Sequence, residues 1–274
     1  VTLDYRGDEF QGAKYLLQVA PDDCTGCTLC VEVCPAKDKG NPRRKALEMR
    51  PAETVRPAAR PLWDYFRQVP EAPRERVPHN VKQVQLFEPL FEFSGACAGC
   101  GETPYVKLLT QLFGDRAVIA NATGCSSIYG GNLPTTPYAA NADGRGPAWA
   151  NSLFEDNAEF GLGMRLASDV QAGLAKRHLQ AMSDQLDPEL VDDLLNAPQL
   201  TEHDLVDQER RVAKLVDQLQ TMEQTPLVRN LLSVADHLLR RSVWIIGGDG
   251  WAYDIGSGGV DHVLASGRDV NVLV

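Results

Sequence analysis

Four cysteines near the start of the chain have a spacing that predicts iron–sulfur chemistry. Cys24, Cys27, Cys30 and Cys34 are separated by two, two and three residues, and Pro35 follows directly. Three thiolates on one tight loop can bind three irons of a [4Fe–4S] cube, while the fourth in such a run binds a second cluster. Zinc sites more often show two separated cysteine pairs, and disulfides need an oxidising compartment. We therefore predict that this loop contributes ligands to two [4Fe–4S] clusters.

Two clusters of this kind need two such cysteine runs, and the sequence holds only one. The chain begins at Val1 without an initiator Met and ends in the apolar run 270–274, which predicts a buried strand. We therefore expect a segment of a longer polypeptide.

A second set of cysteines lies further along the chain. Cys97 and Cys100 form a C-x2-C pair, and Cys125 stands apart from them. Such a set is compatible with a redox dithiol, a zinc site or three ligands of another cluster. Neighbouring glycines would let the backbone approach an inorganic cube closely. Cys125 also follows a predicted strand, where functional residues of open α/β sheets gather.

A Gly-rich turn late in the chain is the candidate for binding a diphosphate. Gly248, Asp249 and Gly250 directly follow the apolar run 243–246. Backbone N–H groups in such a turn can face a diphosphate while the carboxylate binds Mg²⁺. A plain tight turn is the alternative. The glycine order of a dinucleotide fold and the lysine of a P-loop are missing. Thiamin diphosphate enzymes remain, and their second metal-ligand segment would fall beyond Val274.

The elements that carry these residues follow from length, composition and periodicity. With 274 residues, of which 43% are hydrophobic and 23% charged, the chain has room for one large domain and a small one. We expect a cysteine-rich domain over 1–50 and a linker over 51–80, whose prolines prevent a long regular element. An α/β domain follows over 81–274.

Within the α/β domain, apolar runs predict buried strands at 116–122 and 243–247. Between them, apolar residues at helical spacing predict a helical insertion over about 183–241. Within it, residues 184–202 have the acidic, turn-broken pattern of an inserted helical hairpin, which we expect to be a packing element without chemistry.

Charge and cysteine usage exclude several classes of function. The 27 basic and 37 acidic residues give a net charge of −10, which argues against nucleic-acid binding. No apolar stretch has the length of a membrane span, and no signal-peptide pattern is present. Seven cysteines, most of them in cluster spacing, fit a reducing compartment. We therefore expect no membrane contact and a cytoplasmic location.

Taken together, the motifs resemble the C-terminal part of pyruvate:ferredoxin (flavodoxin) oxidoreductases. The resemblance spans essentially the whole chain and is carried by residues 24–35, 93–105, 121–127, 155–161 and 248–266. It implies a doubly wound thiamin diphosphate-binding domain with a helical insertion. Part of a small α+β ferredoxin-like domain with two [4Fe–4S] clusters would precede this domain.

The same resemblance implies roles for individual residues. Cys97, Cys100 and Cys125 would bind the cluster nearest the thiamin, which brings the full protein to three clusters. Glu102 and Cys125 would also contact the cofactor. The diphosphate would be held, through Mg²⁺ on Asp249, by Gly248, Asp249, Gly250 and Trp251. No catalytic residue is expected in this chain, because the activating glutamate and the pyruvate-binding residues belong to other domains. The chain is therefore not expected to be active alone.

The implied reaction is the oxidative decarboxylation of pyruvate with coenzyme A to acetyl-CoA and CO2. Electrons would pass through the clusters to ferredoxin or flavodoxin, and a homodimer is expected. The basic triplet Arg43, Arg44 and Lys45 is a candidate docking patch for such an acidic partner. Three alternatives stay open: the same chemistry on another 2-oxoacid, an electron-transfer module without decarboxylase activity, and a zinc-binding scaffold.

Overall fold

The computed structural model describes residues 2–131 and 135–274, which form two compact units. The first unit comprises the described part of Val1–Phe87 together with Gly95–Pro104, and the second comprises Glu88–Ser94 and Tyr105–Val274. Val1, where the predicted small domain begins, lies outside the described residues. No helix in the described ranges is both long and apolar enough to span a membrane.

The first unit has little regular structure and a small core. Its strands β1 (Thr2–Asp4) and β2 (Lys14–Leu16) pair antiparallel. The helical elements are α1 (Leu29–Glu32), α2 (Ala52–Phe66) and the 3-10 turns η1 (Asp8–Phe10), η2 (Arg74–Arg76) and η3 (Gln83–Leu86). No residue between 21 and 76 is buried. The cysteine loop therefore has no apolar core of its own.

The expectation that prolines prevent a long regular element over 51–80 is wrong. Helix α2 runs for 15 residues with Pro57 and Pro61 inside it. The two prolines are four residues apart, so the hydrogen bonds that they remove fall on one side of the helix. Arg56 and Arg60 each pair with Asp22 at 2.9 Å and fasten the helix to the chain just before the cysteine loop.

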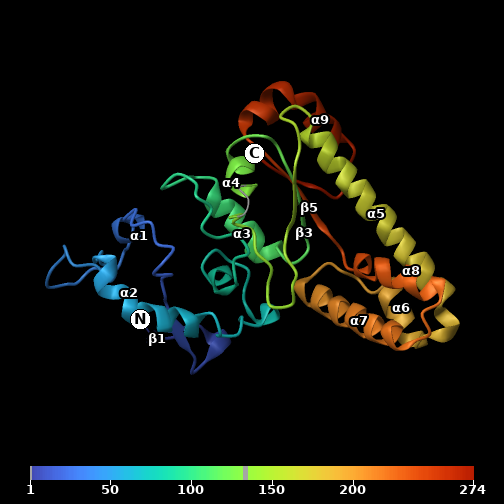
Figure 1. Cartoon of the computed structure of the whole chain (residues 1–274), viewed down its shortest axis with the longest axis horizontal. Helices are drawn as coiled ribbons and strands as arrows, with labels where there is room; N and C mark the ends of the chain where they lie inside the picture. The colour runs from blue at the N-terminus through green and yellow to red at the C-terminus, as the bar shows by residue number, and fades with distance from the viewer. Residues whose placement is uncertain (1, 132–134) are drawn as a thin grey trace. The chain divides into compact units, whose positions relative to one another are not determined.

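The second unit is built on a parallel sheet with the strand order β4-β3-β5-β6, of which Figure 1 labels β3 and β5. Its strands are β3 (Ala117–Asn121), β4 (Ala148–Asn151), β5 (Ser242–Ile246) and β6 (Asn271–Leu273). The predicted strands at 116–122 and 243–247 are confirmed. The terminal run 270–274 also contains a strand, but β6 is half-buried rather than buried, because it pairs only with β5 at the edge of the sheet.

Both faces of the sheet are covered. Adjacent residues of a strand point to opposite faces, and Ile245 and Ile246 accordingly belong to different hydrophobic clusters. Ile245 packs under helices α5 (Asn157–Ala181) and α9 (Ser257–Ala265). Ile246 packs with residues of α3 (Thr103–Phe113). The expected α/β class with a parallel sheet is confirmed.

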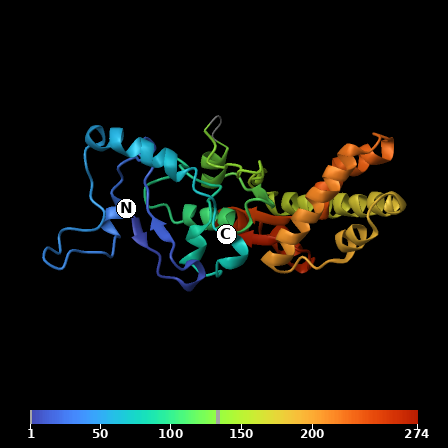
Figure 2. The same cartoon turned by 90° about the horizontal axis from the view of Figure 1, so that it is seen from below.

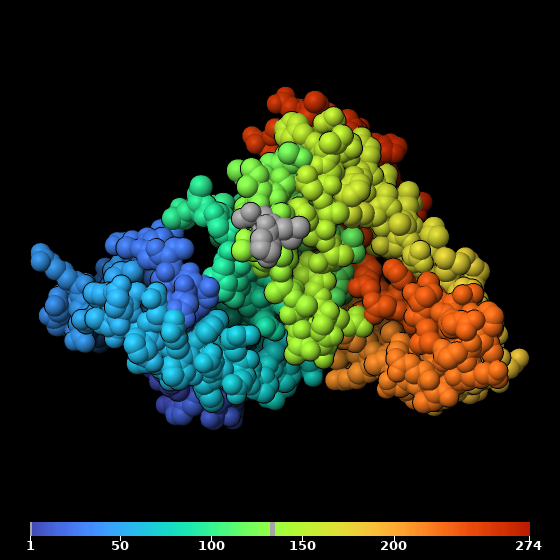
Figure 3. Space-filling model, viewed as in Figure 1, coloured from blue at the N-terminus to red at the C-terminus, as the bar shows by residue number. Residues whose placement is uncertain are grey.

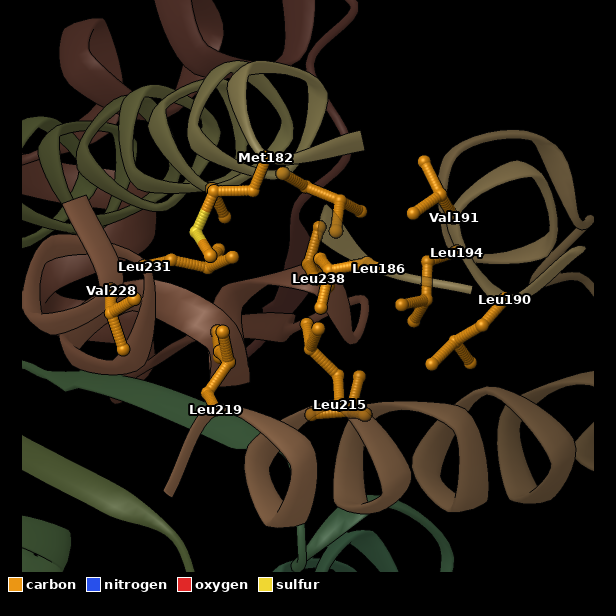
Figure 4. Packing of buried hydrophobic residues seen from close by; sticks show 14 residues of the cluster. Met182, Leu186, Leu190, Val191, Leu194, Leu215, Leu219, Val228, Leu231 and Leu238 are labelled. Atoms are coloured by element: carbon orange, nitrogen blue, oxygen red, sulfur yellow. The ribbon is translucent and has the colours of Figure 1, made fainter. Parts of the chain in front are cut away.

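The helical insertion has a separate core. It comprises η4 (Ser183–Gln185), α6 (Pro188–Asn196), α7 (Glu202–Thr221), α8 (Pro226–Val234) and η5 (Ala235–Leu238). These helices gather around the C-terminal half of α5, to one side of the strands (Figures 1 and 2). In the space-filling view, their orange surface lies directly below the yellow surface of α5 (Figure 3). Leu215, Leu219 and Leu231 are fully buried there (Figure 4). The predicted helical insertion is therefore confirmed.

Candidate functional site

The cysteine loop of the first unit turns sharply between its thiols. Gly26 and Thr28 have positive φ angles of 72° and 67°. For a β-branched residue such as Thr28, this conformation costs on the order of 1–3 kcal/mol and marks a constrained site. Alternating backbone turns of this kind point successive N–H groups into an anion-binding concavity, which is common at Fe–S sites. The four thiols are free, and those of Cys24, Cys27 and Cys30 are exposed.

Cys34 differs from the other three thiols because the chain folds back over it. Residues 36–46 form a hairpin in which Ala46 N–H donates to the Ala36 carbonyl at 3.0 Å. Backbone hydrogen bonding at Ala36 is the main cause that lowers the pKa of the Cys34 thiol, and partial burial opposes it. Backbone groups of Leu47 and Ala46 and the charge of Lys45 add to the lowering. The thiolate is the form that binds a metal.

The second cysteine pair lies beside the first set within the same unit. Cys100 N–H donates to the Cys97 carbonyl at 3.0 Å, which closes a tight turn in which Gly99 has φ of 76°. A Cβ at Gly99 would lie 3.7 Å from a methyl carbon of Leu29, the first residue of α1. The turn that carries Cys97 and Cys100 is therefore packed against the helix that carries Cys30.

In the second unit, Cys125 and the turn at Gly248–Gly250 lie at the same edge of the sheet. Asn121, the last residue of β3, pairs with Ile246, the last residue of β5, so the two strands end side by side at the same edge of the sheet. Gly124 and Cys125 follow β3, and the turn at Gly248–Gly250 follows β5. The next strand in the chain, β4, pairs with β3 on the side opposite β5, so β3 and β5 flank a topological switch point. Ligands of open α/β sheets bind outside the carboxyl ends of the strands at such a point.

A buried polar network holds this edge together and was missed by sequence reasoning. Asn157, fully buried at the start of α5, donates from Nδ2 to the Ile246 carbonyl at 3.0 Å and accepts from Ser152 Oγ at 3.0 Å. Asn121, also fully buried, donates to the Ala122 carbonyl and to Ser126 Oγ. The available signal was Asn121 inside the predicted strand 116–122 and Asn157 within the run 155–161, and neither position indicates by itself which carbonyl or hydroxyl the side chain will bind.

The turn after β5 fits a diphosphate and a cation. A Cβ at Gly247 would lie 2.7 Å from both Ala122 and Trp251, whereas Gly248 has open space around it. Asp249 is exposed and, in the part of the chain that the structure describes, makes no hydrogen bond or ion pair. The indole Nε1 of Trp251 is buried without a partner. An anionic cofactor and its metal ion fit this turn, because the backbone at Gly248 is open to approach, the Asp249 carboxylate is free and Trp251 Nε1 is a donor without a partner.

The predicted ligands do not all fall in one unit. Cys97, Cys100 and Glu102 belong to the first unit, while Cys125 and Asp249 belong to the second. Within residues 2–131 and 135–274, no group of three or more His, Cys, Asp or Glu side chains is placed to hold a single metal ion. One carboxylate at the sheet edge is notable, since Asp156 Oδ1 is buried without a hydrogen-bond partner.

Comparison with known proteins matches both the motif and the whole chain. A family model described as a 4Fe-4S binding domain matches residues 17–37. The chain is 58% identical to the pyruvate-flavodoxin oxidoreductase of Nostoc sp., with 100% of the chain covered. It is 55% identical to that of Rhodospirillum rubrum, with 98% covered. It is 50% identical to the pyruvate:ferredoxin oxidoreductase of Moorella thermoacetica, with 100% covered. The chain spans 23% of the length of each of these proteins. The resemblance seen in the sequence and the [4Fe–4S] character of the cysteine loop are confirmed.

Proposed function

We propose that the chain is a segment of a pyruvate:flavodoxin or ferredoxin oxidoreductase that conducts electrons and holds part of the thiamin site. The full protein would convert pyruvate and coenzyme A to acetyl-CoA and CO2, and the electron pair released would leave through [4Fe–4S] clusters. The observation that carries this proposal is the sheet edge. Cys125 and Asp249, separated by more than a hundred residues in the sequence, follow neighbouring parallel strands at the switch point.

For the cluster ligands, we assign Cys24, Cys27 and Cys30 to one cluster and Cys34 to another. Cys97, Cys100 and Cys125 would bind a third, nearest the thiamin. The contact between the Cys97–Cys100 turn and α1 supports this order, because it brings the second cysteine pair next to the first cysteine run. The absence of any buried residue from 21 to 76 also fits, since bound clusters can supply the cross-links that a small apolar core cannot.

For the thiamin site, the doubly wound domain would present the turn after β5 to the diphosphate. Asp249 would bind Mg²⁺, and backbone N–H groups at Gly248 and Gly250 would face phosphate oxygens. Trp251, Glu102 and Cys125 would complete this half of the cofactor site. Thiamin diphosphate, when bound, supplies the electron sink that decarboxylation requires. The other domains of the full polypeptide would supply the pyruvate-binding residues, in a cytoplasmic homodimer.

The test is anaerobic reduction of flavodoxin and of ferredoxin by the full-length protein, with each of several 2-oxoacids, with and without coenzyme A. We expect fast reduction that depends on pyruvate and on coenzyme A. Faster reduction with another 2-oxoacid would change the substrate. No reduction with any acid, by protein that contains its iron and its thiamin, would leave an electron-transfer module and refute the enzyme assignment.

A further inference from the structure

The basic triplet 43–45 is not one uniform patch. Arg43 and Arg44 are exposed, whereas Lys45 is half-buried. Lys45 Nζ donates to the carbonyls of Val31 and Glu32, both at 2.6 Å. A lysine held by two backbone carbonyls has a fixed position, and it is not free to meet a docking partner in the way that its two neighbours are.

The place where Lys45 is held lies between cluster ligands. Val31 and Glu32 are in the last part of α1, directly after Cys30 and before Cys34. The hairpin described above returns the chain to this point: Lys37 and Lys45 form an antiparallel bridge, and Asp38 N–H donates to the Arg44 carbonyl at 2.9 Å. The fold therefore brings an ammonium group beside the segment that joins the ligands of two different clusters.

The charge of Lys45 is not neutralised locally. Among the residues that the structure describes, Lys45 makes no ion pair with a carboxylate, whereas Arg44 pairs with Glu48. Reduction adds negative charge to a cluster, so a fixed cation nearby stabilises the reduced form more than the oxidised form. Net charge and hydrogen bonds to sulfur are two of the factors that set cluster potentials.

We propose that Lys45 is a positioning residue that raises the reduction potential of the cluster bound by Cys34, by fixing a positive charge beside the Cys30–Cys34 segment. The inference rests on the proposed ligand role of Cys34 and not on thiamin, pyruvate or coenzyme A. It also removes Lys45 from the candidate docking patch and leaves Arg43 and Arg44 as its exposed members.

The test is a redox titration of the full-length protein with a chemical mediator and reductant, followed by the electron paramagnetic resonance signals of the clusters. Lys45→Met should move the midpoint of one cluster to a more negative potential, with unchanged iron content. Lys45→Arg, which keeps the charge, and Arg43→Met, which removes an exposed neighbouring charge, should leave every midpoint where it is in the wild type. An unchanged midpoint in Lys45→Met, or an equal shift in Arg43→Met, would overturn the proposal.

A second variant covers the case in which Lys45→Met loses iron. Lys45→Gln keeps an N–H donor, on a side chain one bond shorter, but carries no charge, so it should retain the clusters and show the negative shift. Loss of iron from both neutral variants would overturn the proposal, because Lys45 would then be needed to hold the loop together rather than to set a potential. Because no 2-oxoacid is present, failure of this inference is distinguishable from failure of the proposed reaction.

Discussion

Asp249 is exposed on the turn after β5, with no partner among the described side chains, while the strand behind it is buried. A carboxylate placed in this way at the end of a parallel strand has little structural role, so its removal should affect ligand binding more than folding. The two carboxylates of this edge differ, because the Asp156 oxygen is buried and unpaired.

We expect Asp249→Ala to abolish retention of thiamin diphosphate and Mg²⁺ in the full-length protein, while iron content and thermal stability stay unchanged. The physical reason is the loss of a carboxylate ligand to the cation. Asp261→Ala, which removes another exposed carboxylate from α9, is the matched control and should retain the cofactor. Equal loss of thiamin and iron from Asp249→Ala would show that the turn is structural.

Asn157 should matter for both stability and cofactor binding. Asn157→Ala removes one of two donors to the Ile246 carbonyl, which also accepts from Ala122 N–H at 2.8 Å, so it should lower the free energy of unfolding by about 0.5–1.5 kcal/mol. Since Ile246 directly precedes the Gly-rich turn, we also expect weaker binding of thiamin diphosphate by about tenfold or more, equivalent to about 1.4 kcal/mol. Calorimetric titration measures the affinity. Ser152→Ala also removes contacts of Ser152 Oγ with the carbonyls of Asn121 and Leu153, but it leaves the bond from Asn157 to Ile246 in place and should weaken thiamin binding less. An unchanged affinity in Asn157→Ala would contradict the positioning role.

At the scale of elements, helix α5 connects the two cores of the second unit. Its first turns pack on the sheet through Ala158 and Leu162, and its later turns pack on the insertion through Ala175 and Leu179. Close approach to the sheet depends on Gly161, since a Cβ there would lie 2.4 Å from Ile245 Cγ1 and 3.2 Å from Ala120 Cβ. The helix that carries Asn157 can therefore lie this close to the sheet only because residue 161 has no side chain.

Two glycines of α5 should respond to alanine in opposite directions. Gly161→Ala should destabilise the protein by about 1–3 kcal/mol, because the added methyl group overpacks the interface with β5. Gly163→Ala, on the exposed side of the same helix with open space around it, should stabilise the protein by about 0.5–1 kcal/mol through helix propensity. Denaturant unfolding of the two variants measures both effects. A gain in stability from Gly161→Ala would refute this packing of α5.

At the scale of the whole second unit, the insertion is tied to the end of the sheet opposite the candidate site. Each of three strands is preceded by an arginine that pairs with an acid of the insertion. Arg116 pairs with Glu202 at 3.1 Å, Arg145 with Glu209 at 3.0 Å and with Asp236 at 2.8 Å, and Arg241 also with Asp236. Arg116 is itself buried. The insertion therefore closes one edge of the sheet, and the carboxyl edge stays available for ligands.

These pairs predict how stability depends on pH. Partial burial would raise the pKa of Asp236, but the guanidinium groups of Arg241 and Arg145 outweigh it and hold this pKa below its usual value. The stabilisation is therefore present above the ordinary pKa of an aspartate and is lost as pH falls through the lower value of the folded state. Burial raises the pKa of Glu209, so its contribution has the opposite sign and is lost as pH rises.

We expect Asp236→Asn to reduce the free energy of unfolding at neutral pH and to flatten its fall on the acid side. Thermal melts across the acid range measure this dependence. Glu209→Gln, at the other acid bonded to Arg145, is the comparison: it should leave the acid-side fall in place. An acid-side fall in Asp236→Asn as steep as that of the wild type would locate the acid sensitivity elsewhere.

The sequence by itself determined the features that depend on neighbouring residues. Cysteine spacing identified the cluster loop, apolar runs identified β3 and β5, and helical periodicity identified the insertion, because ligand sets on one loop and amphipathic patterns are local properties of the chain.

The helix through Pro57 and Pro61 was missed because its anchor, Asp22, lies far away in the sequence. Only the tertiary structure decided that Asn157 binds the carbonyl of Ile246, 89 residues away. It likewise decided that the Cys97–Cys100 turn packs on α1 and that Lys45, but not Arg43, is held by the carbonyls of Val31 and Glu32. Contacts of this kind depend on strand order and chain reversal, which no local pattern specifies.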